Sequence, residues 1–128
     1  MLRNRLAWVV ALGFLALAGC RTAPIHAVVA APVVSTKPLT TQSVEAAIIR
    51  AGSGLGWRMV PQGPGRMTGT LALRTHVAVV DIQFDSKTYS IKYKDSTNLD
   101  YTGNSIHKNY NGWIENLDNA IRVQLGTS

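Results

Sequence analysis

The sequence predicts one small α+β domain over residues 41–125. Its expected order is a helix, a four-stranded mostly antiparallel sheet and a second helix, with both helices on one sheet face. Apolar residues recur at spacings of three and four in 41–51 and 106–124, which is the period of an amphipathic helix. Between these segments, apolar and polar residues alternate in successive runs, which is the period of a half-buried strand.

The first predicted helix runs from residue 41 to about Ala51. Its candidate N-caps are Thr40, Thr41 and Ser43. Its apolar side consists of Val44, Ala47, Ile48 and Ala51. Gly52 is the expected left-handed stop. The glycine-rich segment 52–56 has the composition of a phosphate-binding loop, but it follows a helix and precedes the strand-like 57–60. Since phosphate loops follow a strand and open a helix, we interpret this segment as a turn.

A turn at 61–65 leads into three alternating runs that predict a meander. A hairpin centred on Ser86-Lys87 sets Phe84 opposite Tyr89, Ile82 opposite Ile91, and Val80 opposite Tyr93. The same register sets Asp81 opposite Lys92 on the other face, so apolar meets apolar and acid meets base. The preceding turn at Thr75-His76 lacks favourable turn residues. One long bent strand over 70–84 is therefore an alternative.

A polar loop over 95–104 precedes the last predicted helix, which is expected from 106 to about 124 with Ser105 as its cap. The apolar positions of this helix are Ile106, Tyr110, Trp113, Leu117, Ala120 and Ile121. Gly112 lies within it and costs about 1 kcal/mol relative to alanine. Residues 126–128 are expected to fray.

The N-terminus has the organisation of an export signal. Arg3 and Arg5 form a short positive region, and residues 6–17 are almost wholly apolar. This stretch is too short to cross a bilayer, which takes about 20 residues, and it suits the core of a signal peptide. Leu17-Ala18-Gly19-Cys20 then resembles the lipobox of bacterial lipoproteins at all four positions.

The lipobox resemblance implies that residues 1–19 are a signal peptide that is removed, and that diacylglycerol is joined to the Cys20 sulfur. The new amine is usually acylated with a palmitate-like chain. One chain binds a membrane only marginally, whereas two or three anchor it durably. In this pathway aspartate after the cysteine usually implies inner-membrane retention, and Arg21 stands there instead. The expectation is therefore the periplasmic face of the outer membrane. A cleaved secretory peptide with a chance cysteine is the alternative.

Residues 21–40 follow Cys20 and have three prolines, few charges and no sustained period. They predict a flexible tether, so that 20–40 comprises the lipidated cysteine and a linker. An edge strand over 27–34 that docks on the domain is the alternative. Removal of residues 1–19 leaves 11 basic and 7 acidic side chains, a net charge of +4 before histidine. That mild basicity suits anionic lipid or cell-wall polymer, and the compartment makes nucleic acid an implausible partner.

Two surfaces are candidate sites. If both helices cover one sheet face, the other face is a candidate contact surface formed by Thr70, Val77, Val79, Lys92 and Lys94, with Thr68, Ala72 and Ser90 beside them. The second candidate is a loop site formed by Asn98, Tyr101, His107, Tyr110 and Asn111. The two asparagines and the histidine could hold the loop on the helix by hydrogen bonds, or they could rim a binding site.

Catalytic and metal chemistry have little support in the sequence. His107 lies near Asp95, Ser96, Asp100 and Ser105, so a hydrolase centred on His107 is conceivable, but no nucleophile elbow precedes a helix. The three histidines lie in separate segments without ligand spacing, and lipidation would consume the single cysteine. We therefore expect no enzymatic activity, no cofactor and no metal.

The pattern of Tyr93-Lys94-Asp95-Ser96, Asn98-Leu99 and Tyr101, followed by Ile106-His107, Tyr110-Asn111, Trp113-Ile114 and Leu117, resembles small bacterial envelope lipoproteins over residues 44–121. The resemblance implies the helix, meander and helix order and assigns no catalytic residue. The expected function is that of a membrane-anchored interaction or accessory protein with an envelope protein as partner. The alternative is binding of peptidoglycan or another glycan through Tyr101, Tyr110 and their neighbours.

Overall fold

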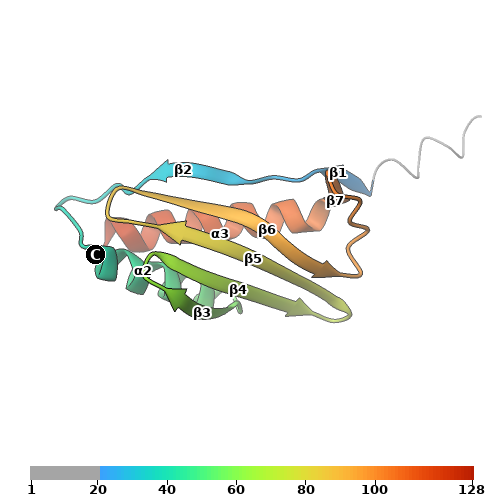
Figure 1. Cartoon of the computed structure of the whole chain (residues 1–128), viewed down its shortest axis with the longest axis horizontal. Coiled ribbons are helices and arrows are strands. Elements are labelled where there is room, and N and C mark those ends of the chain that lie inside the picture. Colours follow the sequence, from blue (N-terminus) through green and yellow to red (C-terminus); the bar gives the residue numbers. More distant parts are fainter. Residues whose placement is uncertain (1–20) are drawn as a thin grey trace, which may run out of the picture.

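The computed structural model describes residues 21–128, so the predicted signal peptide and Cys20 lie outside the described residues. The described chain is α+β, with two helices, a five-stranded sheet and a two-stranded sheet (Figure 1). Its elements are β1 (Thr22–Pro24), β2 (Val28–Pro32), α2 (Thr41–Gly54), β3 (Arg58–Gly63), β4 (Arg66–Leu73), β5 (His76–Phe84), β6 (Thr88–Thr97), β7 (Ser105–His107) and α3 (Lys108–Gly126).

The large sheet has the strand order β2-β6-β5-β4-β3, and all neighbours are antiparallel. The predicted hairpin register is confirmed, from Phe84 opposite Tyr89 to Asp81 opposite Lys92. The alternative of one bent strand over 70–84 is wrong, because β4 and β5 form a tight hairpin in which Leu73 faces His76. Arg74 makes this turn in the left-handed region at φ 56°.

The predicted number of four strands is wrong, because the supposed tether contributes a fifth. β2 pairs with β6, with Val28 opposite Ile91 and Ala31 opposite Tyr89. β1 pairs with β7 in the small sheet. Residues 22–32 are thus two paired strands rather than a flexible linker, and the alternative of a docked edge strand describes β2. The prolines are compatible with this because an edge strand has one side free of partners.

Burial explains why the edge segment docks. Val28 and Ala31 are 7% exposed and join the core, whereas Val29 between them is 68% exposed. The register shifts between the two buried residues, and the Ser90 hydroxyl accepts a hydrogen bond from the amide of Ala30 at that point. A bulge therefore lets both residues face inward across an odd spacing.

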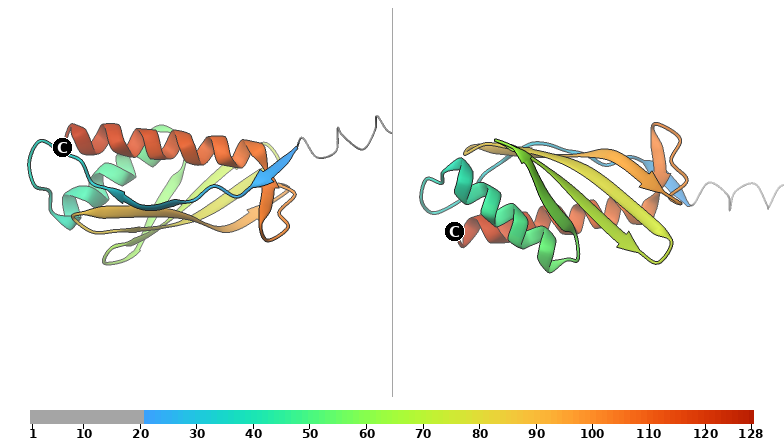
Figure 2. Two further views of the ribbon diagram at one scale, coloured as in Figure 1. Left: turned by 90° about the horizontal axis from the view of Figure 1, so that it is seen from above. Right: turned by 60° about the horizontal axis from the view of Figure 1, so that its bottom comes forward.

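Both helices lie on the same side of the large sheet in Figure 2. They pack on each other and on the inward face of the sheet, and the core contains residues from all of these elements. The buried helical residues are Val44, Ala47, Ile48 and Ala51 of α2, and Tyr110, Ile114, Leu117, Ile121 and Leu125 of α3. The matching sheet residues include Met67, Leu71, Ala78, Val80, Ile82, Phe84, Tyr89 and Ile91.

The helix ends differ from the predicted ones. Thr40 caps α2 by accepting a hydrogen bond from the amide of Ser43, as expected, but the helix runs through Gly52 to Gly54. The expected left-handed stop at Gly52 is therefore wrong. The last helix begins at Lys108, because 105–107 form β7 and His107 is the cap in place of Ser105. The C-terminal residues are bonded rather than frayed, since the Ser128 hydroxyl donates to the carbonyl of Gln124.

Candidate functional site

The candidate loop site proves to consist largely of structural contacts. His107 Nδ1 accepts the amide of Asn109 at 3.1 Å and so caps α3, while the backbone amide of His107 donates to the carbonyl of Leu99 at 2.7 Å. The Asn98 side chain donates to the Thr75 hydroxyl at 2.8 Å. These bonds fasten the 98–104 loop to the start of α3 and to the β4–β5 turn.

Asn111 fastens the N-terminal segment to α3. Its Oδ1 accepts the amide of His26 and its Nδ2 donates to the carbonyl of Pro24, both at 2.9 Å. The Asn111 side chain therefore supplies hydrogen bonds to the backbone between β1 and β2, where no partner strand is present to supply them. This accounts for the amide group of Asn111 without a ligand.

The tyrosines of the loop site have different environments. Tyr101 is 45% exposed and stacks on Tyr93 with ring centroids 4.1 Å apart. Tyr110 is fully buried and meets the ring of Tyr93 edge-on at 5.9 Å. Burial raises the pKa of the Tyr110 phenol above its usual value. Tyr110 has no exposed face on which a sugar ring could stack, so of these two residues only Tyr101 is accessible to a glycan.

The fold brings two histidines together. The rings of His76 and His107 have centroids 6.4 Å apart, and His76 Nδ1 is 2.7 Å from the carbonyl oxygen of Asn98. His26 is exposed and lies on the β1–β2 connection. Nearby hydroxyls are engaged elsewhere, Ser96 with Tyr93 and Ser105 with Thr102. Within residues 21–128, no three histidine, cysteine or acidic side chains gather as metal ligands.

The candidate contact surface is formed as one face, which we call the open face because it points away from the helices. Pairing across four strands sets its residues in rows. One row is Arg58, Thr70, Val79 and Asp95, and a second is Val60, Thr68, Asp81 and Lys92. Val77 lies two residues before Val79 on β5, in the next row, opposite Ala72. The predicted members Thr70, Val77, Val79 and Lys92 therefore occupy neighbouring rows.

Lys94 also lies on the open face, two residues after Lys92 on β6, at a bulge. Val79 pairs with Asp95 and Val80 with Tyr93, which leaves Lys94 as the extra residue of β6. Its ammonium lies 3.6 Å from the Asp81 carboxylate, with both side chains about half exposed. Asp81 thus faces Lys92 in the ladder and forms its ion pair with Lys94.

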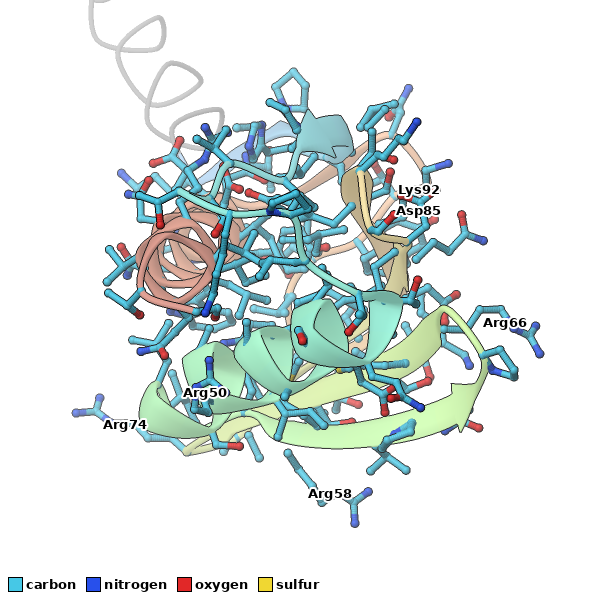
Figure 3. All side chains as sticks on the ribbon, turned by 90° about the vertical axis from the view of Figure 1, so that its left-hand side faces the viewer. Arg50, Arg58, Arg66, Arg74, Asp85 and Lys92 are labelled. Carbon is cyan, nitrogen blue, oxygen red and sulfur yellow. The ribbon has the colours of Figure 1, made fainter. Side chains whose placement is uncertain are left out.

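The charge of the open face is positive. Arg58 and Arg66 project away from the helices, as does Lys92 (Figure 3). The ion pairs between side chains of residues 21–128 are Lys94 with Asp81 and Arg122 with Asp118, so these three cations have no paired carboxylate there. With the Lys94–Asp81 pair neutral, Asp95 offsets one of the three cations, and Asp85, which lines a neighbouring hollow with Arg66, offsets a second. A small excess of positive charge remains.

A shallow hollow of about 240 Å³, which we call the polar hollow, lies on this face. It is lined by Gln62, Arg66, Met67, Thr68, Asp81, Ile82, Gln83 and Lys94. The Thr68 hydroxyl oxygen is buried beneath it and has no hydrogen-bond partner within the described chain. Since buried polar atoms are nearly always bonded, this hydroxyl is an exception within the described chain.

Sequence reasoning missed Arg58, Arg66 and the polar hollow. Arg58 is placed by the pairing of β3 on β4, and Arg66 by the hairpin at Pro64-Gly65. The alternation of Met59 inward and Val60 outward in the 57–60 run was the available signal, because it also directs Arg58 outward.

Comparison with known proteins gives no assignment, because no family model, no curated protein and no solved structure matches the chain. Neither helix in residues 21–128 combines the length and the apolar character that crossing a membrane requires.

Proposed function

We propose that this protein is a lipid-anchored, non-enzymatic module of the bacterial envelope that binds an acidic surface of another envelope protein through its open face. The observation that carries the proposal is the outward position of Arg58, Arg66 and Lys92 on a sheet face that both helices leave uncovered. Arg66 lines the polar hollow on this face.

The anchor rests on the lipobox Leu17-Ala18-Gly19-Cys20. Arg21 after the cysteine favours the periplasmic face of the outer membrane over the inner membrane. Growing cells labelled with radioactive palmitate test this part. The native chain should incorporate label, and Cys20→Ser should abolish both the label and membrane fractionation. A native chain that takes up no label contradicts the anchor.

A macromolecular partner is favoured over a small ligand by the dimensions of the site. Pockets for small molecules usually enclose about 300–1,000 Å³ and cover most of the ligand. The polar hollow is smaller, at about 240 Å³, and belongs to a broad face. Rows of valine and threonine with arginine among them suit a protein interface, in which arginine is enriched. Complementarity requires acidic groups on the partner.

Site-specific photocrosslinking in intact cells tests the open face. A photoreactive residue at Thr70 or Lys92 should yield a discrete adduct, whereas one at Asn119, exposed on α3, should not. Lys92→Glu should reduce the adduct from position 70. Lys87→Glu, the same reversal at the exposed tip of the β5–β6 hairpin, should leave it unchanged. Adducts of equal yield from both faces of the molecule would refute the proposal.

A second assay tests the alternative that the protein binds a glycan. The mature chain is incubated with purified peptidoglycan sacculi, and the retained fraction is measured for the native chain and for Tyr101→Ala. Retention that is lost with this substitution would replace the protein partner by a glycan. We expect no retention, because Tyr110 is enclosed and Asn111 is engaged with the β1–β2 connection.

A further inference from the structure

The proposed lipid site lies directly beside the folded domain. The β1 strand begins at Thr22, so Arg21 alone separates it from Cys20. Arg21 is itself fixed, because its carbonyl accepts the amide of Lys108 at 2.9 Å. β1 then continues the ladder with β7, from Thr22 opposite His107 to Pro24 opposite Ser105. A lipid on Cys20 would therefore have no free tether.

The available reach is short compared with the membrane surface layer. One residue spans at most about 3.6 Å. A bilayer is about 40–45 Å thick with its headgroups and about 30 Å without them, so each headgroup layer is roughly 5–7 Å thick. The start of β1 must then lie within about one headgroup layer of the lipid to which Cys20 is joined. A coil of 20 residues would instead allow a separation of about 25 Å.

The same end of the domain exposes suitable side chains. Figure 1 places β1, β7 and the connection from β6 to β7 together at one end of the long axis. Arg21 and Lys108 are exposed and adjacent through their backbone bond. Tyr101 on the 98–104 loop is 45% exposed. Asp100 on that loop offsets one positive charge. Cations and an amphipathic aromatic ring are the side chains found at an anionic lipid surface.

From these observations we infer that the β1–β7 end of the domain rests in the headgroup layer of an anionic bilayer, with Arg21, Lys108 and Tyr101 as its contacts. The inference rests on the proposed attachment of lipid to Cys20 and adds an orientation to it. The lipid then fixes which end of the domain faces the membrane, because Arg21 and β1, which follow Cys20, are hydrogen-bonded to the domain.

Lysine labelling of the reconstituted full-length lipoprotein tests this orientation. The chain is placed on vesicles of phosphatidylethanolamine and phosphatidylglycerol and treated with a water-soluble amine-reactive ester. Both lysines to be compared are exposed in the domain without a membrane. Lys108 lies at the proposed membrane-facing end, and Lys87 lies on the β5–β6 hairpin. The control variant has a Gly/Ser linker of about 20 residues between Cys20 and Arg21, which gives a reach of about 25 Å.

In the native chain Lys108 should react several-fold more slowly than in the linker variant, whereas Lys87 should react equally in both. Equal rates at Lys108, with both proteins still floating with the vesicles, would overturn the orientation and leave the anchor intact. Failure of the native chain to float with the vesicles would show that the anchor itself is wrong, and the orientation with it.

Discussion

Two buried tyrosines should respond in opposite directions to the same substitution. The Tyr89 hydroxyl donates a hydrogen bond to the Asp118 carboxylate, which also forms an ion pair with Arg122 at 3.3 Å. The Tyr110 hydroxyl is buried without any partner in the described chain. Phenylalanine removes only the hydroxyl in each case. The two substitutions therefore compare the stability lost with a hydrogen-bonded hydroxyl and the stability gained by removing a buried hydroxyl that has no partner.

The magnitudes follow from these contacts. A hydrogen bond to a charged group contributes about 1.5–3 kcal/mol, and an unsatisfied buried polar group costs about 1–3 kcal/mol. Tyr89→Phe should therefore lower the free energy of unfolding by about 2 kcal/mol. Tyr110→Phe should raise it by about 1 kcal/mol. For a domain of this size, 1 kcal/mol corresponds to about 4 °C in Tm.

Urea and thermal unfolding of residues 21–128 measure both effects, and equal m-values for the variants would show that the unfolded reference is unchanged. Destabilisation by Tyr110→Phe comparable to that by Tyr89→Phe would refute the argument, because it would require a partner for the Tyr110 hydroxyl. An unchanged stability in Tyr89→Phe would show that the Asp118 contact makes no net contribution.

Three further predictions concern stability and local order. Gly112→Ala should stabilise α3 by about 0.5–1 kcal/mol in thermal unfolding, because an added Cβ has no neighbour within 4 Å; a loss of stability would contradict this. Asn111→Ala should speed amide exchange in residues 22–32, whereas Asn119→Ala, on the exposed side of the same helix, should not; equal exchange in both would remove the role given to Asn111. Burial raises the folded-state pKa of Tyr89 and Tyr110, and their stabilisation is complete below the unfolded pKa of about 10 and decreases as pH rises above it. Unfolding free energy should fall above that pH by about 1.4 kcal/mol per pH unit for each tyrosine, and Tyr110→Phe should reduce the slope by that amount; an unchanged slope would contradict the assignment.

The sequence was most informative where local pairing decides the structure. The β5–β6 register follows from a short turn and from apolar residues that must share a face, so Ile82 and Ile91 could be paired correctly. The outward row with Asp81 and Lys92 followed from the same choice. The register shift at Lys94 could not be predicted from the sequence. The residue after it is also polar, so the bulge produces no recognisable change in the alternation of apolar and polar residues.

The N-terminal segment was predicted as a tether, with an edge strand over 27–34 as the alternative, because its pairing is non-local. Pro24 and Pro32 indicate broken structure, and the bulge removes the two-residue period between Val28 and Ala31. Only the partner strand β6, about 60 residues later, makes these residues part of the core. Tyr110 of the candidate loop site is a different case. The three-and-four spacing of apolar residues placed Tyr110 on the buried side of α3, and the structure has it there. That spacing predicted the role of Tyr110 better than the capacity of its aromatic ring to stack on a sugar.

The paired N-terminus relates the proposed anchor to the open face. Figure 1 shows the long strands running along the axis that ends at β1 and β7. If that end lies on the bilayer, β6, the longest strand with 10 residues, leads away from the membrane over about 33 Å. The open face then points sideways, parallel to the membrane surface. Its partner must lie beside the protein and within that height, which favours another membrane-associated protein over a distant polymer.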